Sequence, residues 1–91
     1  MLIYFQMIDS TENWLKFEQI YTTYRPLMFR IANDILHNEQ DAEDTVHSAF
    51  IKIAENIARV GEPLCPKTKS YVVIIVADCN KNLYWERLFV E

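Results

Sequence analysis

The chain has 91 residues, of which 51% are hydrophobic, with one glycine, three prolines and a net charge of −4. This length supports a single domain with one hydrophobic core, and the composition argues against both a disordered chain and a turn-rich β-sandwich. The acidic balance argues against tight, independent binding to duplex DNA, because such binding depends on Lys and Arg contacts with phosphates.

The first eight residues, Met1 to Ile8, are mostly apolar, but they include no basic residue and are too short for a signal peptide or a membrane span. Two interpretations stay open: an arm packed along the domain, or a surface for a second copy of the chain or an inhibitor. We therefore divide the chain into an N-terminal arm, residues 1–9, and a helical domain, residues 10–91, and expect a cytoplasmic protein.

A first helix is predicted to begin at Asp9 or Ser10, either of which can cap it. Apolar and aromatic residues recur on one face, and Glu12 and Lys16 are spaced to pair on the other. Pro26 lacks a backbone donor, so a break or kink is expected there, with Pro26 in the first turn of a second helix that ends near His37. The apolar positions are Trp14, Phe17, Ile20, Tyr21 and Tyr24 in the first helix and Leu27, Met28, Ile31, Ala32, Ile35 and Leu36 in the second.

The central stretch, Asn38 to Val60, has the strongest helical pattern. Asn38 or Asp41 can cap its start, and four carboxylates lie in the first turns, where the helix dipole favours negative charge. Gly61 is expected to take a left-handed conformation just past the end. One apolar stripe runs along this helix, at Ala42, Val46, Ala49, Phe50, Ile53 and Ile57.

Residues 62–69 contain Pro63 and Pro66 and indicate a loop. The following residues, 71–76, are rich in β-branched side chains and favour a strand by propensity. Helical spacing continues through them, however, and a lone strand would have no partner among helices. We therefore predict a helix from about Thr68 to Leu88.

No glycine-rich phosphate loop, nucleophile elbow or HExxH motif is present, and neither an enzyme nor a cofactor is expected. The carboxylates Glu39, Asp41, Glu43 and Asp44 favour a solvated helix start over a metal site, because consecutive helical residues point in different directions. The two cysteines, Cys65 and Cys79, fit no metal or redox spacing and are expected to be unrelated free thiols.

Two blocks of the sequence resemble one known family. Residues 41–53 read DAEDTVHSAFIKI, and the segment from Phe17 to Ala32 has Tyr21 and Tyr24 at matching positions. These blocks are similar to region 2 of bacterial sigma factors of the extracytoplasmic-function type, in which an acidic DAED precedes V-Q-E-x-F. The resemblance covers roughly residues 14–87 and implies an all-α, compact bundle of about four helices.

The resemblance implies that the central helix binds the clamp coiled coil of the RNA polymerase core. The residues that would carry this role by position are Asp44, His47, Ser48, Phe50 and Ala54. Asp44 can accept a forked pair of hydrogen bonds from an arginine. This sequence departs from the family at His47 and Ser48, where Gln and Glu are usual, and the missing Glu charge should weaken docking.

The resemblance also implies that the last helix and the loop before it recognise and melt the promoter −10 element as single-stranded DNA. Tyr71 stands where the family has a stacking Trp, whereas Val73 and Ile74 replace an aromatic residue and an arginine. Asp78 stands where the family has Asn and would repel phosphate. The DNA-binding residues carried over are Lys67, Lys69, Tyr71, Asp78, Lys81, Asn82 and Arg87. Tyr71 is equally compatible with core packing and with base stacking.

The first interpretation is therefore a sigma factor domain in transcription initiation, without catalytic activity. The alternative is a degenerate sigma-like interaction or dimerisation module that does not read DNA. The replacement of the family's aromatic, arginine and asparagine residues by Val73, Ile74 and Asp78 favours this alternative. Complete factors of this type carry a second helical domain, so the chain is either one domain of such a protein or a single-domain relative. An anti-sigma factor and a second copy of the chain are further candidate partners, and no membrane partner is expected.

Overall fold

The computed structural model describes Tyr4 and residues 6–90, with residues 82–90 described by their backbone alone. Three long helices make up this part of the chain: α2 (Thr11–Leu36), α3 (Glu39–Glu55) and α4 (Pro66–Val90), with a short 3-10 helix, η1 (Ile57–Arg59), after α3. No strand occurs in the described ranges. The all-α class is confirmed, and the expected number of about four helices is slightly too high.

The expected start of a second helix at Pro26 is wrong, because Pro26 lies inside the continuous helix α2. Pro26 is on the exposed side, and a proline inside a helix costs about 3 kcal/mol through its missing donor and its steric clash. Burial on either side of it offsets this cost. Four core residues continue through the proline at four-residue spacing, namely Ile20, Tyr24, Met28 and Ala32.

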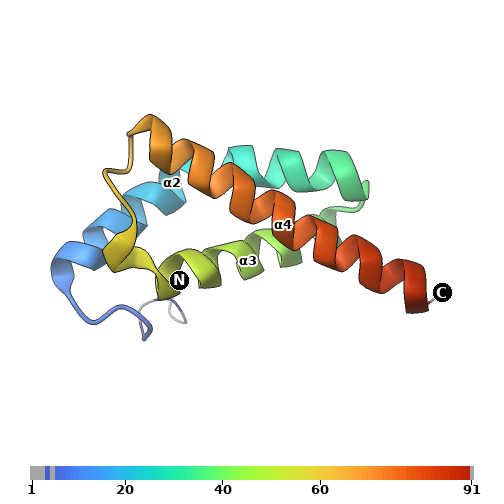
Figure 1. The fold of residues 1–91 in the computed structure, drawn as a ribbon, viewed down its shortest axis with the longest axis horizontal. Coiled ribbons are helices and arrows are strands. Elements are labelled where there is room, and N and C mark those ends of the chain that lie inside the picture. The colour runs from blue at the N-terminus through green and yellow to red at the C-terminus, as the bar shows by residue number, and fades with distance from the viewer. Residues whose placement is uncertain (1–3, 5, 91) are drawn as a thin grey trace.

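The starts of α2 and α3 follow the predicted caps, and α2 ends near the predicted position. Ser10 accepts a hydrogen bond from the Asn13 backbone at 3.1 Å, and Asn38 accepts one from the Asp41 backbone at 3.0 Å. Between α2 and α3, His37 takes the left-handed conformation (φ 52°), and its N–H bonds to the Asn33 carbonyl. This single left-handed residue reverses the chain, so α2 and α3 pack side by side (Figure 1).

The central helix is shorter than predicted, because α3 ends at Glu55 rather than near Val60. Asn56 has φ −112° and ψ 15°, and the chain then tightens into η1, which keeps Ile57 and Val60 buried while the backbone changes direction. Gly61 does not adopt a positive φ, so the predicted glycine cap is also wrong. The early end leaves residues 60–65 as a loop against α2.

The segment rich in β-branched residues is helical, as predicted, and α4 packs against both α2 and α3 (Figure 1). Pro66 occupies its first turn, where a missing N–H has no cost. Val72, Val76 and Cys79 are buried at helical spacing, which shows that tertiary packing overrides the strand propensity. Ile74, on the opposite side, is 66% exposed.

The core includes part of the N-terminal arm. Tyr4 and Ile8 are buried against the bundle, whereas Met1 to Ile3 and Phe5 lie outside the described residues. The Tyr4 ring lies against α3, where it packs on the rings of His47 and Phe50. Tyr4 and Ile8 therefore belong to the same core as the helices.

Candidate functional site

One face of α3 carries the polar residues that the resemblance assigns to polymerase binding. Asp44, His47 and Ser48 are all exposed and lie on adjacent turns. Gln40 donates a 3.2 Å hydrogen bond to Oδ1 of Asp44, which orients the carboxylate and leaves Oδ2 for another donor. We name these three residues, Asp44, His47 and Ser48, the docking face.

Phe50 and Ala54, also assigned to that role, lie in the core instead. Phe50 is completely buried and Ala54 is 2% exposed, so neither side chain can reach a partner while the domain is folded. The Phe50 ring packs 4.7 Å from the Tyr21 ring and 5.9 Å from the Phe17 ring, measured between centroids. Their place in the motif is explained by packing, because this side of α3 faces α2.

Tyr4 joins the arm to the docking face. Its hydroxyl lies 2.6 Å from Nδ1 of His47, and the two rings are 5.4 Å apart between centroids. Burial, reinforced by the nearby Tyr21 hydroxyl and opposed by Arg25, raises the pKa of Tyr4 to about 12. The phenol is therefore neutral across the physiological range.

This raised pKa predicts a loss of stability in alkali. The neutral phenol is favoured in the folded state, so its contribution is complete below the unfolded pKa of about 10 and disappears as the pH rises towards about 12. Urea unfolding of the native protein and of Tyr4→Phe should show a steeper loss in the native protein over this range. Identical pH dependence in the two proteins would contradict the expectation.

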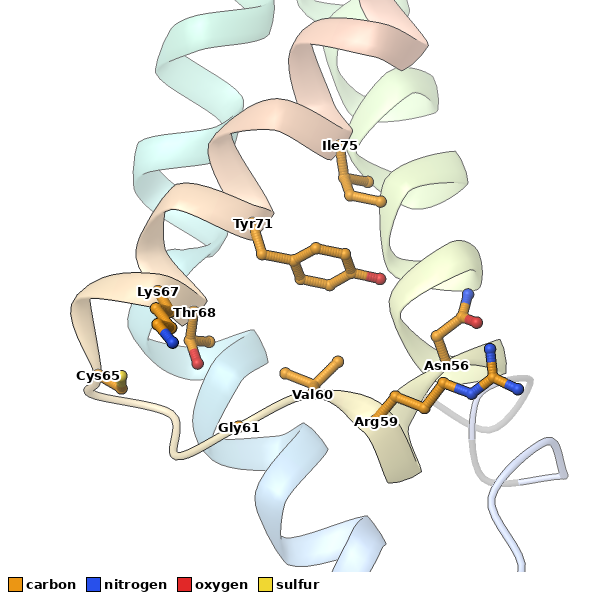
Figure 2. Close-up of a pocket in the computed structure, with 9 residues that line it drawn as sticks. All are labelled: Asn56, Arg59, Val60, Gly61, Cys65, Lys67, Thr68, Tyr71 and Ile75. Carbon is orange, nitrogen blue, oxygen red and sulfur yellow. The ribbon is translucent and has the colours of Figure 1, made fainter.

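A pocket of about 630 Å³ opens between the end of α3 and the start of α4. This is within the range of ~300–1,000 Å³ that is usual for small-ligand sites. Figure 2 shows the Tyr71 ring projecting from α4 towards the end of α3, with Val60 beneath it and Asn56 and Arg59 on the far side. The lining residues are Asn56, Arg59, Val60, Gly61, Cys65, Lys67, Thr68, Tyr71 and Ile75.

Three side chains from outside the loop donate hydrogen bonds to backbone carbonyls of the loop that borders this pocket. Lys16 donates to the Val60 carbonyl at 2.7 Å, rather than pairing with Glu12 as its spacing suggested. Tyr24 donates to the Pro63 carbonyl, and Thr68 donates to the Glu62 carbonyl, both at 2.6 Å. The loop is thus fixed to α2 and α4 through its backbone, which makes the pocket preformed.

The Tyr24 hydroxyl offers a direct test of this anchoring. Tyr24→Phe should lower the free energy of unfolding by about 1–2 kcal/mol, because the hydroxyl and the Pro63 carbonyl are buried and the carbonyl loses its donor. Urea denaturation measures this loss. Tyr21→Phe removes a hydroxyl from the same helix without touching the loop, and an equal loss in that variant would contradict the anchoring role.

The structure brings together only part of the predicted DNA-binding set. Lys67 and Tyr71 line the pocket, and Lys69 is exposed in the first turns of α4. Asp78 and Lys81 are exposed two to three turns farther along that helix. The side chains of Asn82 and Arg87 lie outside the described residues.

Two pocket residues, Asn56 and Arg59, were not predicted as functional. Both were assigned to the last turns of the central helix, and only the early end of α3 turns them towards Tyr71. The sequence does contain a signal at Asn56, because asparagine favours helix ends and turns. The apolar spacing continues to Ile57, however, and it predicts a helix that extends beyond Asn56.

The pocket combines an aromatic ring, two cationic side chains and amide and hydroxyl groups. Burial raises the pKa of the Tyr71 phenol, so this hydroxyl is a neutral hydrogen-bond donor. Arg59 and Lys67 can neutralise a phosphate, and Asn56 can bond to a planar polar edge. Such a site suits an unpaired nucleobase with its phosphate.

Other kinds of site find little support in the described residues. No group of three or more His, Cys, Asp or Glu side chains within them could hold a metal ion. Cys65, at the pocket, and Cys79, buried on α4, are free thiols. None of the helices, over the part that the structure describes, is long and apolar enough to cross a membrane.

Comparison with known proteins identifies the family of this domain. The family model of sigma-70 region 2 matches residues 20–77, more than half of the chain. No curated protein and no solved structure matches the sequence. The matched range includes α3, the loop and the pocket side of α4, and region 2 is a non-enzymatic domain of transcription initiation factors. The chain therefore belongs to the sigma-70 region 2 family, which implies a sigma factor-like role in RNA polymerase binding and promoter recognition.

Proposed function

We propose that this chain acts as region 2 of an extracytoplasmic-function sigma factor. In this proposal the docking face of α3 binds the clamp coiled coil of the RNA polymerase core, and the pocket beside Tyr71 holds an unpaired base of the promoter −10 element. The observation that carries the proposal is the pocket itself, which the Tyr71 ring lines together with Arg59 and Lys67, next to the end of the helix that bears the docking face.

The docking face suits a partner that offers an arginine and further polar groups. Asp44 keeps one carboxylate oxygen beyond its bond to Gln40, and a guanidinium can use it together with the first oxygen. Ser48 can both donate and accept. Phe50 and Ala54, buried behind this face, support α3 without contacting the partner.

Charge explains why polymerase should be needed for DNA binding. From Met1 to Val60 there are five Lys and Arg against nine Asp and Glu, and from Gly61 onward there are four against four. A chain with this charge balance and two cations at its pocket, Arg59 and Lys67, gives weak phosphate binding by itself. Held beside DNA by a basic partner, the same pocket needs to contribute only stacking and local contacts.

Asp44→Ala tests the docking step. Binding to a bacterial RNA polymerase core, measured by isothermal titration calorimetry with the full chain, should weaken by about 10- to 150-fold, because a charge-assisted hydrogen bond is worth about 1.5–3 kcal/mol. Glu18→Ala removes an exposed carboxylate from α2 and should bind like the native protein. Equal affinity of Asp44→Ala and the native protein would contradict docking through this face.

A second candidate function rests on the far side of α4. Ile74, at a position where the family has an arginine, is 66% exposed, and Asp78 is exposed farther along the helix. An apolar and an acidic side chain here favour a sigma-like interaction or dimerisation module that does not read DNA. This candidate predicts polymerase binding without any DNA contribution, or concentration-dependent self-association in sedimentation experiments.

A further inference from the structure

The contact between Tyr4 and His47 joins the N-terminal arm to the docking face across 43 positions of sequence. Tyr4 is 4% exposed, and its ring packs 5.2 Å from Phe17 and 6.3 Å from Phe50, between centroids. The aromatic cluster therefore fixes where the Tyr4 hydroxyl points. His47, in contrast, is exposed and lies one turn beyond Asp44 on the surface of α3.

The direction of this hydrogen bond follows from the groups that are present. A neutral imidazole has one nitrogen that donates and one that accepts. Within the described part of the chain the Tyr4 hydroxyl has one hydrogen-bond partner, Nδ1 of His47 at 2.6 Å. A buried hydroxyl that fails to donate loses the free energy of that bond, so Tyr4 donates and Nδ1 accepts. The remaining hydrogen of the ring is then on Nε2.

Two observations strengthen this assignment. The pKa of Tyr4, raised to about 12 by burial, keeps the hydroxyl protonated and able to donate. An imidazole with its hydrogen on Nδ1 would place a donor against the Tyr4 hydroxyl and leave the buried phenolic proton without an acceptor. The contact therefore selects, between the two tautomers, the one with hydrogen on Nε2.

We propose that Tyr4 is a positioning residue that holds His47 as the neutral Nε2–H tautomer, so that the docking face presents a fixed hydrogen-bond donor beside the Asp44 acceptor. The matching partner surface offers a carbonyl or carboxylate oxygen opposite His47 and a cationic donor opposite Asp44. This inference rests on the proposed function, because it assigns a role within the same docking face. In a free imidazole both tautomers are populated, and the wrong one would set a lone pair against the partner's oxygen.

Nitrogen NMR of the native protein with ¹⁵N-labelled histidine tests the tautomer without any partner. At about pH 8, where an ordinary histidine is neutral, long-range ¹H–¹⁵N correlations should show His47 in the Nε2–H form and a mixture of forms in Tyr4→Phe. His37 serves as the internal control, because it does not contact Tyr4. A native His47 in the Nδ1–H form, or an unchanged tautomer in Tyr4→Phe, would overturn the proposal.

Binding to a bacterial RNA polymerase core tests the consequence. Tyr4→Phe keeps the ring in the cluster and should weaken binding by about threefold to tenfold, the effect of one hydrogen bond. Tyr21→Phe, the matched control from the same cluster, should bind like the native protein. In a His47→Gln background, Tyr4→Phe should cause no further loss, because the Tyr4 effect acts through His47.

The outcomes separate this proposal from the proposed function. If the native protein binds the core and Tyr4→Phe binds equally well, the role of Tyr4 is overturned and the docking face stands. A further loss from Tyr4→Phe in the His47→Gln background would also overturn it, since the effect would then be structural. If the native protein does not bind the core, the proposed function fails, and the docking role of Tyr4 fails with it.

Discussion

Phe50→Ala is expected to lower the free energy of unfolding by about 3–5 kcal/mol, the range for an aromatic residue removed from a core. Phe50 is completely buried, and its ring contacts rings from both α2 and the N-terminal segment. A chain of this size has a small core and a total stability of about 5–15 kcal/mol, so this loss is a large fraction of it. Urea denaturation followed by circular dichroism measures the change.

Phe50→Leu is the matched variant, because it retains most of the apolar volume and should cost much less. If it folds, it should also keep its affinity for the polymerase core, since Phe50 lies behind the docking face and not on it. Two results would contradict this account: a loss below about 1 kcal/mol in Phe50→Ala, or a folded Phe50→Leu that no longer binds the core.

Tyr71→Ala is expected to weaken binding of single-stranded −10 DNA, in the presence of polymerase core, by about 5- to 150-fold. This corresponds to the ~1–3 kcal/mol that one base gains by stacking on an aromatic ring. The Tyr71 ring projects into the pocket and is only partly covered by its neighbours (Figure 2). Fluorescence anisotropy of a labelled oligonucleotide measures the affinity.

Tyr71→Phe separates stacking from the hydroxyl, because it keeps the ring and removes only the donor. It should retain most of the affinity, and circular dichroism should confirm that both variants remain folded. A Tyr71→Ala protein that is folded and binds within twofold of the native protein would show that the ring has only a packing role. The sequence alone left those two roles of Tyr71 equally open.

Local sequence signals predicted two of the three helix starts well. Ser10 and Asn38 cap α2 and α3 as their side-chain chemistry requires, whereas α4 begins at Pro66, inside the predicted loop of residues 62–69. These signals involve neighbouring residues, so no knowledge of the tertiary structure is needed to use them. The helical conformation of residues 71–76 was also predictable, from spacing and from the lack of a partner strand.

Two helix boundaries were predicted wrongly, because the sequence pattern does not show how the local free energy of a backbone conformation compares with the free energy of tertiary packing. Pro26 destabilises the helix locally, yet the buried residues before and after it keep α2 continuous. At the end of α3 the helix stops earlier than predicted. Ile57 is still buried, but a 3-10 turn places it in the core instead of a further α-helical turn. Local patterns do not weigh such alternatives, which differ by a few kcal/mol.

The candidate site was predictable where it depends on one helix, and not where it depends on distant segments. Asp44, His47 and Ser48 share a face by spacing alone. The bond between Tyr4 and His47 and the bond between Lys16 and Val60 each join residues more than forty positions apart. No periodicity encodes such pairs, and Arg59 enters the pocket only because α3 ends early.

The most direct test of the proposed function is the anisotropy of a labelled pool of single-stranded −10 sequences, titrated with the native protein in the presence and absence of a bacterial RNA polymerase core. We expect binding that requires both the chain and the core, because few cations lie at the pocket, and that weakens as salt is raised, because contacts with phosphates release counterions. A complex of chain and core that gives no chain-dependent DNA signal at any sequence would contradict a promoter-reading domain.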